Sequence, residues 1–215
     1  MTAEPGRTSR SEATASIDGD LDAEVPGLAV SVGDPIPSVG LRASDGYLLN
    51  LRSFVGKQPA ALLFFAAPTA EGNQARYGNR LAESLASGAR RLAAANVAVV
   101  GVTTDNERQQ IDWIAEHRWP YLLFSDERRS AVQRLGIPVT AKGRNFNVGR
   151  PIFLIVGRDG LLDAVILEPE PEYVVDIVLA AVRRAEGRDP DLLDESEPMP
   201  KSGATEPAGQ PTVGS

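Results

Sequence analysis

Two continuous apolar runs constrain the fold of this chain more than any other feature. Residues 60–66 read AALLFFA and residues 97–104 read VAVVGVTT, without the alternation expected of a strand that has one face in water. Such runs predict strands buried on both faces of a sheet. Between them, residues 74–95 carry apolar side chains at helical spacing. This order of strand, helix and strand predicts an α/β domain.

The helices are predicted from apolar stripes and terminal signals. The helix over 74–95 has an apolar stripe that consists of Tyr77, Leu81, Ala82, Leu85, Ala89 and Leu92. Asp105 is expected to cap the next helix, with Ile111, Ile114 and Ala115 facing inward. A third helix is expected to follow Ser125-Asp126 and to run to Leu135, where Gly136 ends it. The last helix should turn Tyr173, Val174, Ile177, Val178 and Ala181 toward the core.

Two hairpins and a loop complete the predicted order of elements. Near the N-terminus, LRA and YLLNL flank the turn Ser44-Asp45-Gly46 and predict a small hairpin. Residues 121–124 predict a short strand, and the polar, glycine-containing stretch 138–149 is expected to be a loop. Residues 152–156 and 161–168 flank a Gly-Arg-Asp-Gly turn and predict an antiparallel pair. Together these elements predict a central mixed sheet with helices on both faces.

The charge of the chain is concentrated near its ends. The formal net charge is −7, and residues 1–27 and 188–215 each have a net charge of −4, which leaves residues 28–187 close to neutral. Both end segments are rich in Ser, Gly, Pro, Asp and Glu, so we predict two disordered acidic tails around one domain at 28–187. An acidic chain of this kind is not expected to bind nucleic acid, which calls for a basic surface.

The same composition limits location and cofactors. No apolar leader precedes the acidic stretch and no apolar run approaches the roughly 20 residues that cross a bilayer. We therefore expect a cytoplasmic protein without membrane contact. With one histidine and no cysteine, a zinc or iron site would need mostly carboxylates. We expect no metal and no cofactor, and we interpret Asp105, Glu107 and Asp112 as a solvated helix face.

Four segments in the same order resemble one protein family. VGDPIPSVGLRASDGYLLNLRSFVGK precedes the first apolar run, and VVGVTTD covers the second. WPYLLFSDERRSAVQRLGI and FLIVGRDGLL follow. Over residues 33–185 they are similar to the peroxiredoxin or redoxin family, the group of alkyl hydroperoxide reductase and thiol-specific antioxidant. The resemblance implies a thioredoxin-like, three-layer α/β/α fold.

The active-site turn departs from that family because the chain has no cysteine. If FFA at 64–66 matches the strand end of disulfide-exchanging relatives, Thr69 and Gly72 stand at the two cysteine positions. In the peroxidase register, the reactive cysteine would fall near Gln74 or Ala75. Neither register supplies a thiolate, which is the nucleophile of this chemistry. A threonine hydroxyl would need an adjacent base, so Thr69 is interpreted as a helix cap.

The opposite wall of the family's pocket is partly retained. Arg150 lies near the place of the family's peroxide-binding arginine, and Pro151 fits the cis-proline of thioredoxin-like relatives. The alternative is a surface arginine beside a proline that starts a strand. If the pocket persists as a shallow groove, its expected lining is Ala66, Pro68, Thr69, Tyr77, Arg150 and Pro151.

Three functions remain open from the sequence. The first is a redox-inactive, peroxiredoxin-like module that binds a protein partner or a small ligand. The alternative is an antioxidant oxidoreductase of the family type, reducing peroxide or disulfide with an external thiol or partner. The third is a non-redox enzyme that uses the old pocket, although no acid–base pair supports it. Since peroxiredoxins commonly dimerise, the resemblance also implies a homodimer.

Overall fold

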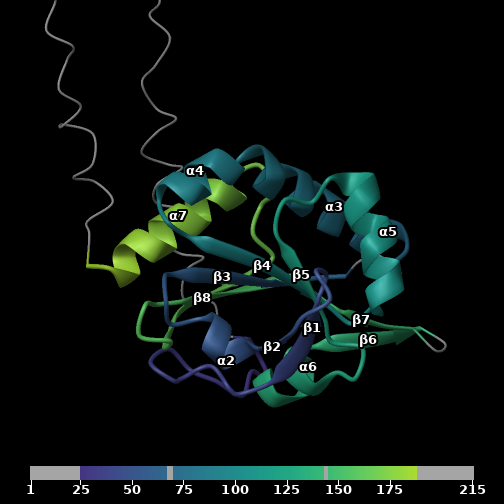
Figure 1. Ribbon diagram of the computed structural model, residues 1–215, viewed down its shortest axis with the longest axis horizontal. Helices are drawn as coiled ribbons and strands as arrows, with labels where there is room; N and C mark the ends of the chain where they lie inside the picture. The colour runs from purple at the N-terminus through teal and green to yellow at the C-terminus, as the bar shows by residue number, and fades with distance from the viewer. Residues whose placement is uncertain (1–24, 67–69, 143–144, 188–215) are drawn as a thin grey trace, which may run out of the picture.

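The computed structural model describes residues 25–66, 70–142 and 145–187, and its core is one mixed sheet (Figure 1). Seven strands lie in the order β2-β1-β5-β4-β3-β8-β9. They are β1 (Gly40–Ala43), β2 (Leu48–Asn50), β3 (Ala60–Phe64), β4 (Ala98–Thr103), β5 (Leu122–Ser125), β8 (Ile152–Val156) and β9 (Leu162–Leu167). β3, β4 and β5 are parallel, whereas β8 runs antiparallel to β3. The predicted fold class is confirmed; the acidic segments 1–24 and 188–215 lie outside the described residues.

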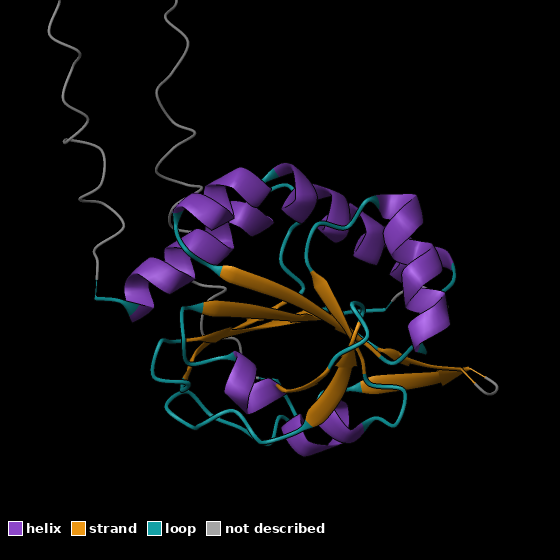
Figure 2. Ribbon diagram, in the orientation of Figure 1, coloured by secondary structure: helices purple, strands orange, loops and turns teal. Residues whose placement is uncertain are grey.

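Helices cover both faces of the sheet (Figure 2). One face carries α3 (Gly72–Ser87), α4 (Ala89–Ala94), α5 (Glu107–His117) and α7 (Val174–Ala185). The other carries α2 (Leu51–Phe54) and α6 (Ser130–Leu135). β3 separates two core clusters: Leu63 packs on the side of α3 and α7, while Leu62 packs on the side of α2 and α6. This explains the unbroken apolar run, because every side chain of β3 is buried.

Both predicted hairpins are present. In the first, Asp45 accepts a hydrogen bond from the backbone N–H of Tyr47, and Gly46 takes the positive φ of 89° that the turn requires. β8 and β9 form the second hairpin, with Ile152 opposite Leu167. At the C-terminal end of α6, Gly136 has the expected left-handed conformation.

The single helix expected over 74–95 is instead two helices, α3 and α4, which meet at Gly88. A Cβ atom built on Gly88 would lie 2.4 Å from Cγ2 of Val175 on α7. The junction therefore lets α7 approach the backbone of this segment. An apolar stripe alone could not show this break, because the stripe continues through both helices.

The expectations for α5 were partly wrong. Its N-cap is Asn106 rather than Asp105, and a reciprocal capping box joins Asn106 to Gln109. Ile111 is 50% exposed, and Ala115 is also exposed. The buried face carries Gln110 and Trp113 instead, because the Trp113 ring packs 5.6 Å from that of Phe65 and fills the space above the sheet.

The remaining corrections concern one predicted loop and the first residues of α6 and α7. Residues 138–149 were expected to be a loop, but they contain a hairpin of β6 (Val139–Lys142) and β7 (Asn145–Val148). α6 begins later than expected, at Ser130, although Asp126 still accepts hydrogen bonds from backbone amides in its first turn. Tyr173 is 54% exposed because it is the N-cap of α7 rather than part of its inner face.

Candidate functional site

The candidate site lies where α3 begins, after the carboxyl end of β3. The helix starts at Gly72, which has a φ of 64°. Its N-cap is Glu71, whose side chain makes no capping hydrogen bond, and the first turn contains no acidic residue. The first backbone N–H groups of a helix have no intrahelical acceptor and form the positive end of its dipole. This turn is therefore a polar, electropositive edge of the site.

Gly78 fixes the position of α3 on the sheet. A Cβ atom at this position would lie 2.7 Å from the carbonyl oxygen of Ala66 and 3.3 Å from Cδ2 of Phe65. The helix therefore rests directly on the main chain that follows β3. Only glycine allows this approach, which positions the first turn of α3 relative to the end of the strand.

Gln74 connects the first turn of α3 to the opposite wall. Its side-chain Nε2 donates to the carbonyl oxygen of Gly149 at 3.1 Å and lies 3.4 Å from Oγ1 of Thr140. Thr140 belongs to β6, and Gly149 precedes β8. Segments far apart in the sequence are thus joined across the site by a neutral amide. Gln74 is also one of the two positions that the peroxidase register assigned to the reactive cysteine.

Beside this connection is an open cavity of about 450 Å³. Its lining consists of Gly149, Pro151 and six polar or charged side chains. The six are those of Asn73, Gln74, Arg76, Tyr77, Arg80 and Glu168. The hydroxyl of Tyr77 donates to the carbonyl oxygen of Pro169 at 2.6 Å. Burial, and then the carboxylates of Glu170 and Glu168, raise the pKa of Tyr77 well above its ordinary value. Tyr77 is consequently a neutral hydrogen-bonding group and not a base.

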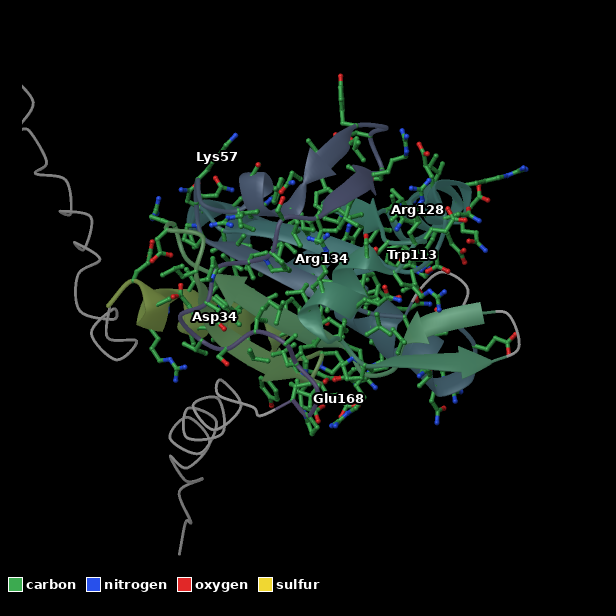
Figure 3. The ribbon with its side chains drawn as sticks, turned by 90° about the horizontal axis from the view of Figure 1, so that it is seen from below. Asp34, Lys57, Trp113, Arg128, Arg134 and Glu168 are labelled. Carbon is green, nitrogen blue, oxygen red and sulfur yellow. The ribbon has the colours of Figure 1, made fainter. Side chains whose placement is uncertain are left out.

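Arg150 forms a solvent-exposed ion pair with Glu168. Its guanidinium group donates to the carboxylate of Glu168, and this hydrogen bond is the main reason that the pKa of Arg150 is raised. The backbone N–H of Glu168 also donates to the carbonyl oxygen of Pro151 at 2.9 Å. Figure 3 labels Glu168 at the lower edge of the described part of the chain. Arg150 does not line the cavity. Its guanidinium group is paired with the carboxylate of Glu168 instead.

The structure brings some of the expected site residues together and separates others. Pro151 and Tyr77 line the cavity, and Gly72 is the residue with which α3 begins. Ala66 is buried, with 2% of its surface exposed. Thr69, like Pro68, lies outside the described residues. Since the N-cap is Glu71, the interpretation of Thr69 as the N-cap of α3 was wrong.

Sequence reasoning missed five residues of the cavity: Asn73, Gln74 as a bridging amide, Arg76, Arg80 and Glu168. A signal for the helical ones was present, because positions 73, 76, 77 and 80 share one helix face. A signal for Glu168 lay in the β8–β9 hairpin, because the pairing of Ile152 with Leu167 places Glu168 opposite Pro151. The Gln74 contact depends on the unexpected β6–β7 hairpin and had no such signal.

Two searches of the described part of the chain, for a metal-binding cluster and for a membrane-spanning helix, gave no candidate. Within residues 25–66, 70–142 and 145–187, no group of three or more His, Cys, Asp or Glu side chains is placed to hold a metal ion. None of the helices described there is both long enough and apolar enough to cross a bilayer.

Comparison with known proteins identifies the family. A search of curated proteins gave no match. Among solved structures, peroxidoxin BcpB from Mycobacterium tuberculosis is 20% identical with a TM-score of 0.62, covering 72% of this chain and 97% of its own. A PrxQ mutant from Xylella fastidiosa is 13% identical with a TM-score of 0.61, covering 74% and 98%. Plasmodium vivax 2-Cys peroxiredoxin is 16% identical with a TM-score of 0.57, covering 74% and 99%.

These identities are low, so the structural likeness supports the fold alone. The family is shown by the sequence itself, because the profile of the AhpC/TSA family matches residues 32–165, more than half of the chain. The match spans the strands and helices that build the site, from the first hairpin to β9. This cysteine-free chain belongs to the AhpC/TSA family.

Proposed function

We propose that this protein is a redox-inactive member of its family that binds a partner or a small ligand at the α3 cavity. The observation that carries the proposal is the Gln74 side chain, whose amide donates to Gly149 across the site at 3.1 Å. The first turn of α3 thus carries a structural hydrogen bond in the region where the family's chemistry needs a nucleophile. The frame of the site is retained, and its reactive atom is absent.

The chemistry of the remaining groups supports the same proposal. Reduction of a peroxide or a disulfide requires a thiolate that attacks oxygen or sulfur, and the chain has no cysteine. Tyr77 is held neutral by burial and neighbouring carboxylates. A helix dipole contributes at most about 2 kcal/mol, so it cannot convert a threonine hydroxyl into a comparable nucleophile. Binding is therefore the activity that this group of residues can perform.

The cavity supplies both signs of charge for recognition. Arg76 and Arg80 line it, together with the carboxylate of Glu168 and the amide of Asn73. Such a lining suits a ligand with a carboxylate or phosphate group next to neutral hydrogen-bonding atoms, which includes peptide segments. Guanidinium groups bind these anions through paired N–H donors, so Arg76 is the residue on which we expect binding to depend most.

A peroxide-consumption assay tests the redox part of the proposal. With hydrogen peroxide or an alkyl hydroperoxide, and with dithiothreitol, glutathione or thioredoxin as donor, we expect the uncatalysed rate. Because the chain lacks a thiolate, none of the donors should change this result. Catalytic turnover that Arg150→Ala abolishes would contradict it and would support an antioxidant oxidoreductase that borrows an external thiol.

Titration calorimetry tests the binding part, with acetate and inorganic phosphate as probes. We expect weak, saturable binding of at least one probe that is lost in Arg76→Ala. The matched control is Arg90→Ala, which removes an exposed arginine of α4 outside the cavity. Equal binding by both variants would place the anions elsewhere and would overturn the assignment of the cavity.

Three further proposals come from the family resemblance and from the composition of the chain. A homodimer is expected, and sedimentation equilibrium at several protein concentrations tests it. We also propose a cytoplasmic location and a domain at 28–187 flanked by disordered tails. Fractionation tests the location, and backbone NMR relaxation of the full chain tests the mobility of the acidic segments.

A further inference from the structure

A second cavity lies at the end of the sheet where β3 begins and α7 ends (Figure 1). Its volume is about 380 Å³, which is in the range of small-molecule sites. Its lining includes Pro59, directly before β3, and Glu186, directly after α7. The α3 cavity, in contrast, follows the carboxyl end of β3. The two cavities therefore lie at opposite ends of the same strand and share no lining residue.

One wall of the second cavity is apolar. It includes Pro59, Val156 at the end of β8 and Val182 of α7, and all three residues are buried. Ala185, one turn further along α7, is an exposed residue of the same wall. A wall of this kind favours a ligand that brings a hydrocarbon part out of water.

Two carboxylates meet at the turn between β8 and β9. A Cβ atom built on Gly157 would lie 2.5 Å from Oδ2 of Asp163 and 2.8 Å from Oδ1 of Asp159. Both oxygens thus approach one point, and a side chain at residue 157 would occupy the space that they share. Oδ1 of Asp159 also accepts from the backbone N–H of Leu161 at 3.0 Å, which fixes this carboxylate in the turn. The acidic pair is therefore held at one side of the cavity.

The charge of this pair is not balanced by the basic residue that lines the cavity. That residue is Arg158, whose Nε lies 3.0 Å from Oε1 of Glu186. Within the described part of the chain, the carboxylate of Asp163 has neither a hydrogen bond nor an ion pair. Burial, followed by repulsion from Asp159, raises the pKa of Asp163. A cation bound between the two carboxylates would offset this repulsion.

We propose that this cavity binds a small aliphatic amine, with its ammonium group at Asp159 and Asp163 and its hydrocarbon chain against the apolar wall. An ammonium group has three N–H donors and one positive charge, which suits two carboxylates that face one point. A divalent metal ion fits less well, because it needs several oxygen ligands and the apolar wall offers none. The α3 cavity has two arginines in its lining, so the two sites select ligands of opposite charge.

Amide chemical shifts of the full chain test the proposal, with n-butylammonium chloride as the ligand at about 0.15 M salt. At this ionic strength the Debye length is about 8 Å, so general attraction of a cation to the acidic chain is largely screened. We expect saturable shifts at the amides of Gly157, Asp163 and Val182, with a dissociation constant of roughly 1–10 mM.

Two further compounds separate charge from hydrocarbon. Ammonium chloride supplies the charge without the chain, and 1-butanol supplies the chain without the charge. Because the cavity offers both carboxylates and an apolar wall, each should bind at least about tenfold more weakly than n-butylammonium. Equal affinity for ammonium would show that the apolar wall takes no part, and equal affinity for 1-butanol would show the same of the carboxylates. Either result overturns the proposal.

Substitution of the carboxylates locates the site. Asp163→Asn and Asp159→Asn should each weaken the binding of n-butylammonium by about tenfold or more. Both positions are partly or fully exposed, and an asparagine at residue 159 keeps an oxygen that can accept from Leu161. The matched control, Asp112→Asn on the exposed face of α5, makes the same change of net charge and should bind like the parent. Affinity that both cavity variants retain, or that falls equally in the control, overturns the assignment.

Discussion

Asp163 shows how a single residue links charge to stability in this protein. It lies on β9 close to Asp159, and burial, followed by the repulsion from Asp159, raises its pKa. The folded state therefore holds the proton of Asp163 more tightly than the unfolded state does. As pH rises from the unfolded value of about 4 through the folded value, ionisation of Asp163 lowers the free energy of unfolding.

We therefore predict that Asp163→Asn is more stable than the parent at pH 7 and that this advantage disappears below about pH 4. The neutral amide keeps the shape of the side chain and removes the repulsion. Urea denaturation of both proteins across this pH range measures the difference. Asp112→Asn, on the exposed face of α5, is the control for the change of net charge. An advantage of Asp163→Asn that persists unchanged at pH 3 would contradict the explanation.

At the scale of elements, the junction of α3 and α4 predicts how two substitutions affect stability together. Gly88→Ala places a methyl group 2.4 Å from Cγ2 of Val175, so it should destabilise the fold by about 1–3 kcal/mol. Val175→Ala removes the obstructing methyl groups. In the double variant, the loss of stability should be smaller than the sum of the two single losses by about 0.5 kcal/mol or more.

Thermal or urea unfolding of the four proteins in this cycle measures the coupling. A control pair, Ala86→Gly with Val175→Ala, changes α3 close to the junction without adding a methyl group. Its effects should add. Strict additivity in the Gly88 cycle would show that the break between α3 and α4 has another cause than the approach of α7.

The elements differ in how far the sequence predicted them. The buried strands β3 and β4 were clear, because an unbroken apolar run permits few alternatives to a strand covered on both faces. The inner face of α5 was misjudged because its packing is decided by Trp113, which lies between Phe65 and Trp119. A helical stripe shows which residues are apolar, and tertiary contacts decide which of them are covered.

The candidate site was less predictable than the fold. Pro151 and Tyr77 were placed at the cavity from the resemblance, whereas Arg150 was expected in the groove and is paired with Glu168 instead. The bridging role of Gln74 depends on β6 and on the segment before β8, which meet only in three dimensions. Long-range polar contacts of this kind leave no periodic signal in the sequence.

For the whole molecule, the two core clusters predict how distant truncations combine. Leu85 is fully buried in the cluster of α3, α5 and α7, and Leu135 is fully buried in the cluster of α2 and α6. We expect Leu85→Ala and Leu135→Ala each to cost about 2–5 kcal/mol. Because the sheet separates the two sites, their effects should add to within about 0.5 kcal/mol.

Chemical denaturation followed by tryptophan fluorescence and by circular dichroism measures this sum. Both probes should report one transition, since the strands contribute side chains to both clusters. Two separated transitions, or a double variant far from the sum, would show that the layers unfold independently. Ile111→Ala, at a half-exposed position of α5, serves as the surface control and should cost well under 1 kcal/mol.

The contact at Gly78 has a consequence for any chemistry that this scaffold could host. Since α3 rests on the main-chain oxygen of Ala66, no rotamer change at Gly78 can move the helix relative to the end of β3. The position of α3 on the sheet therefore does not depend on which functional group its first turn carries. A sulfur atom engineered onto the first turn of α3 would lie beside the cavity that is already present. The scaffold of this family and its reactive group are therefore separable.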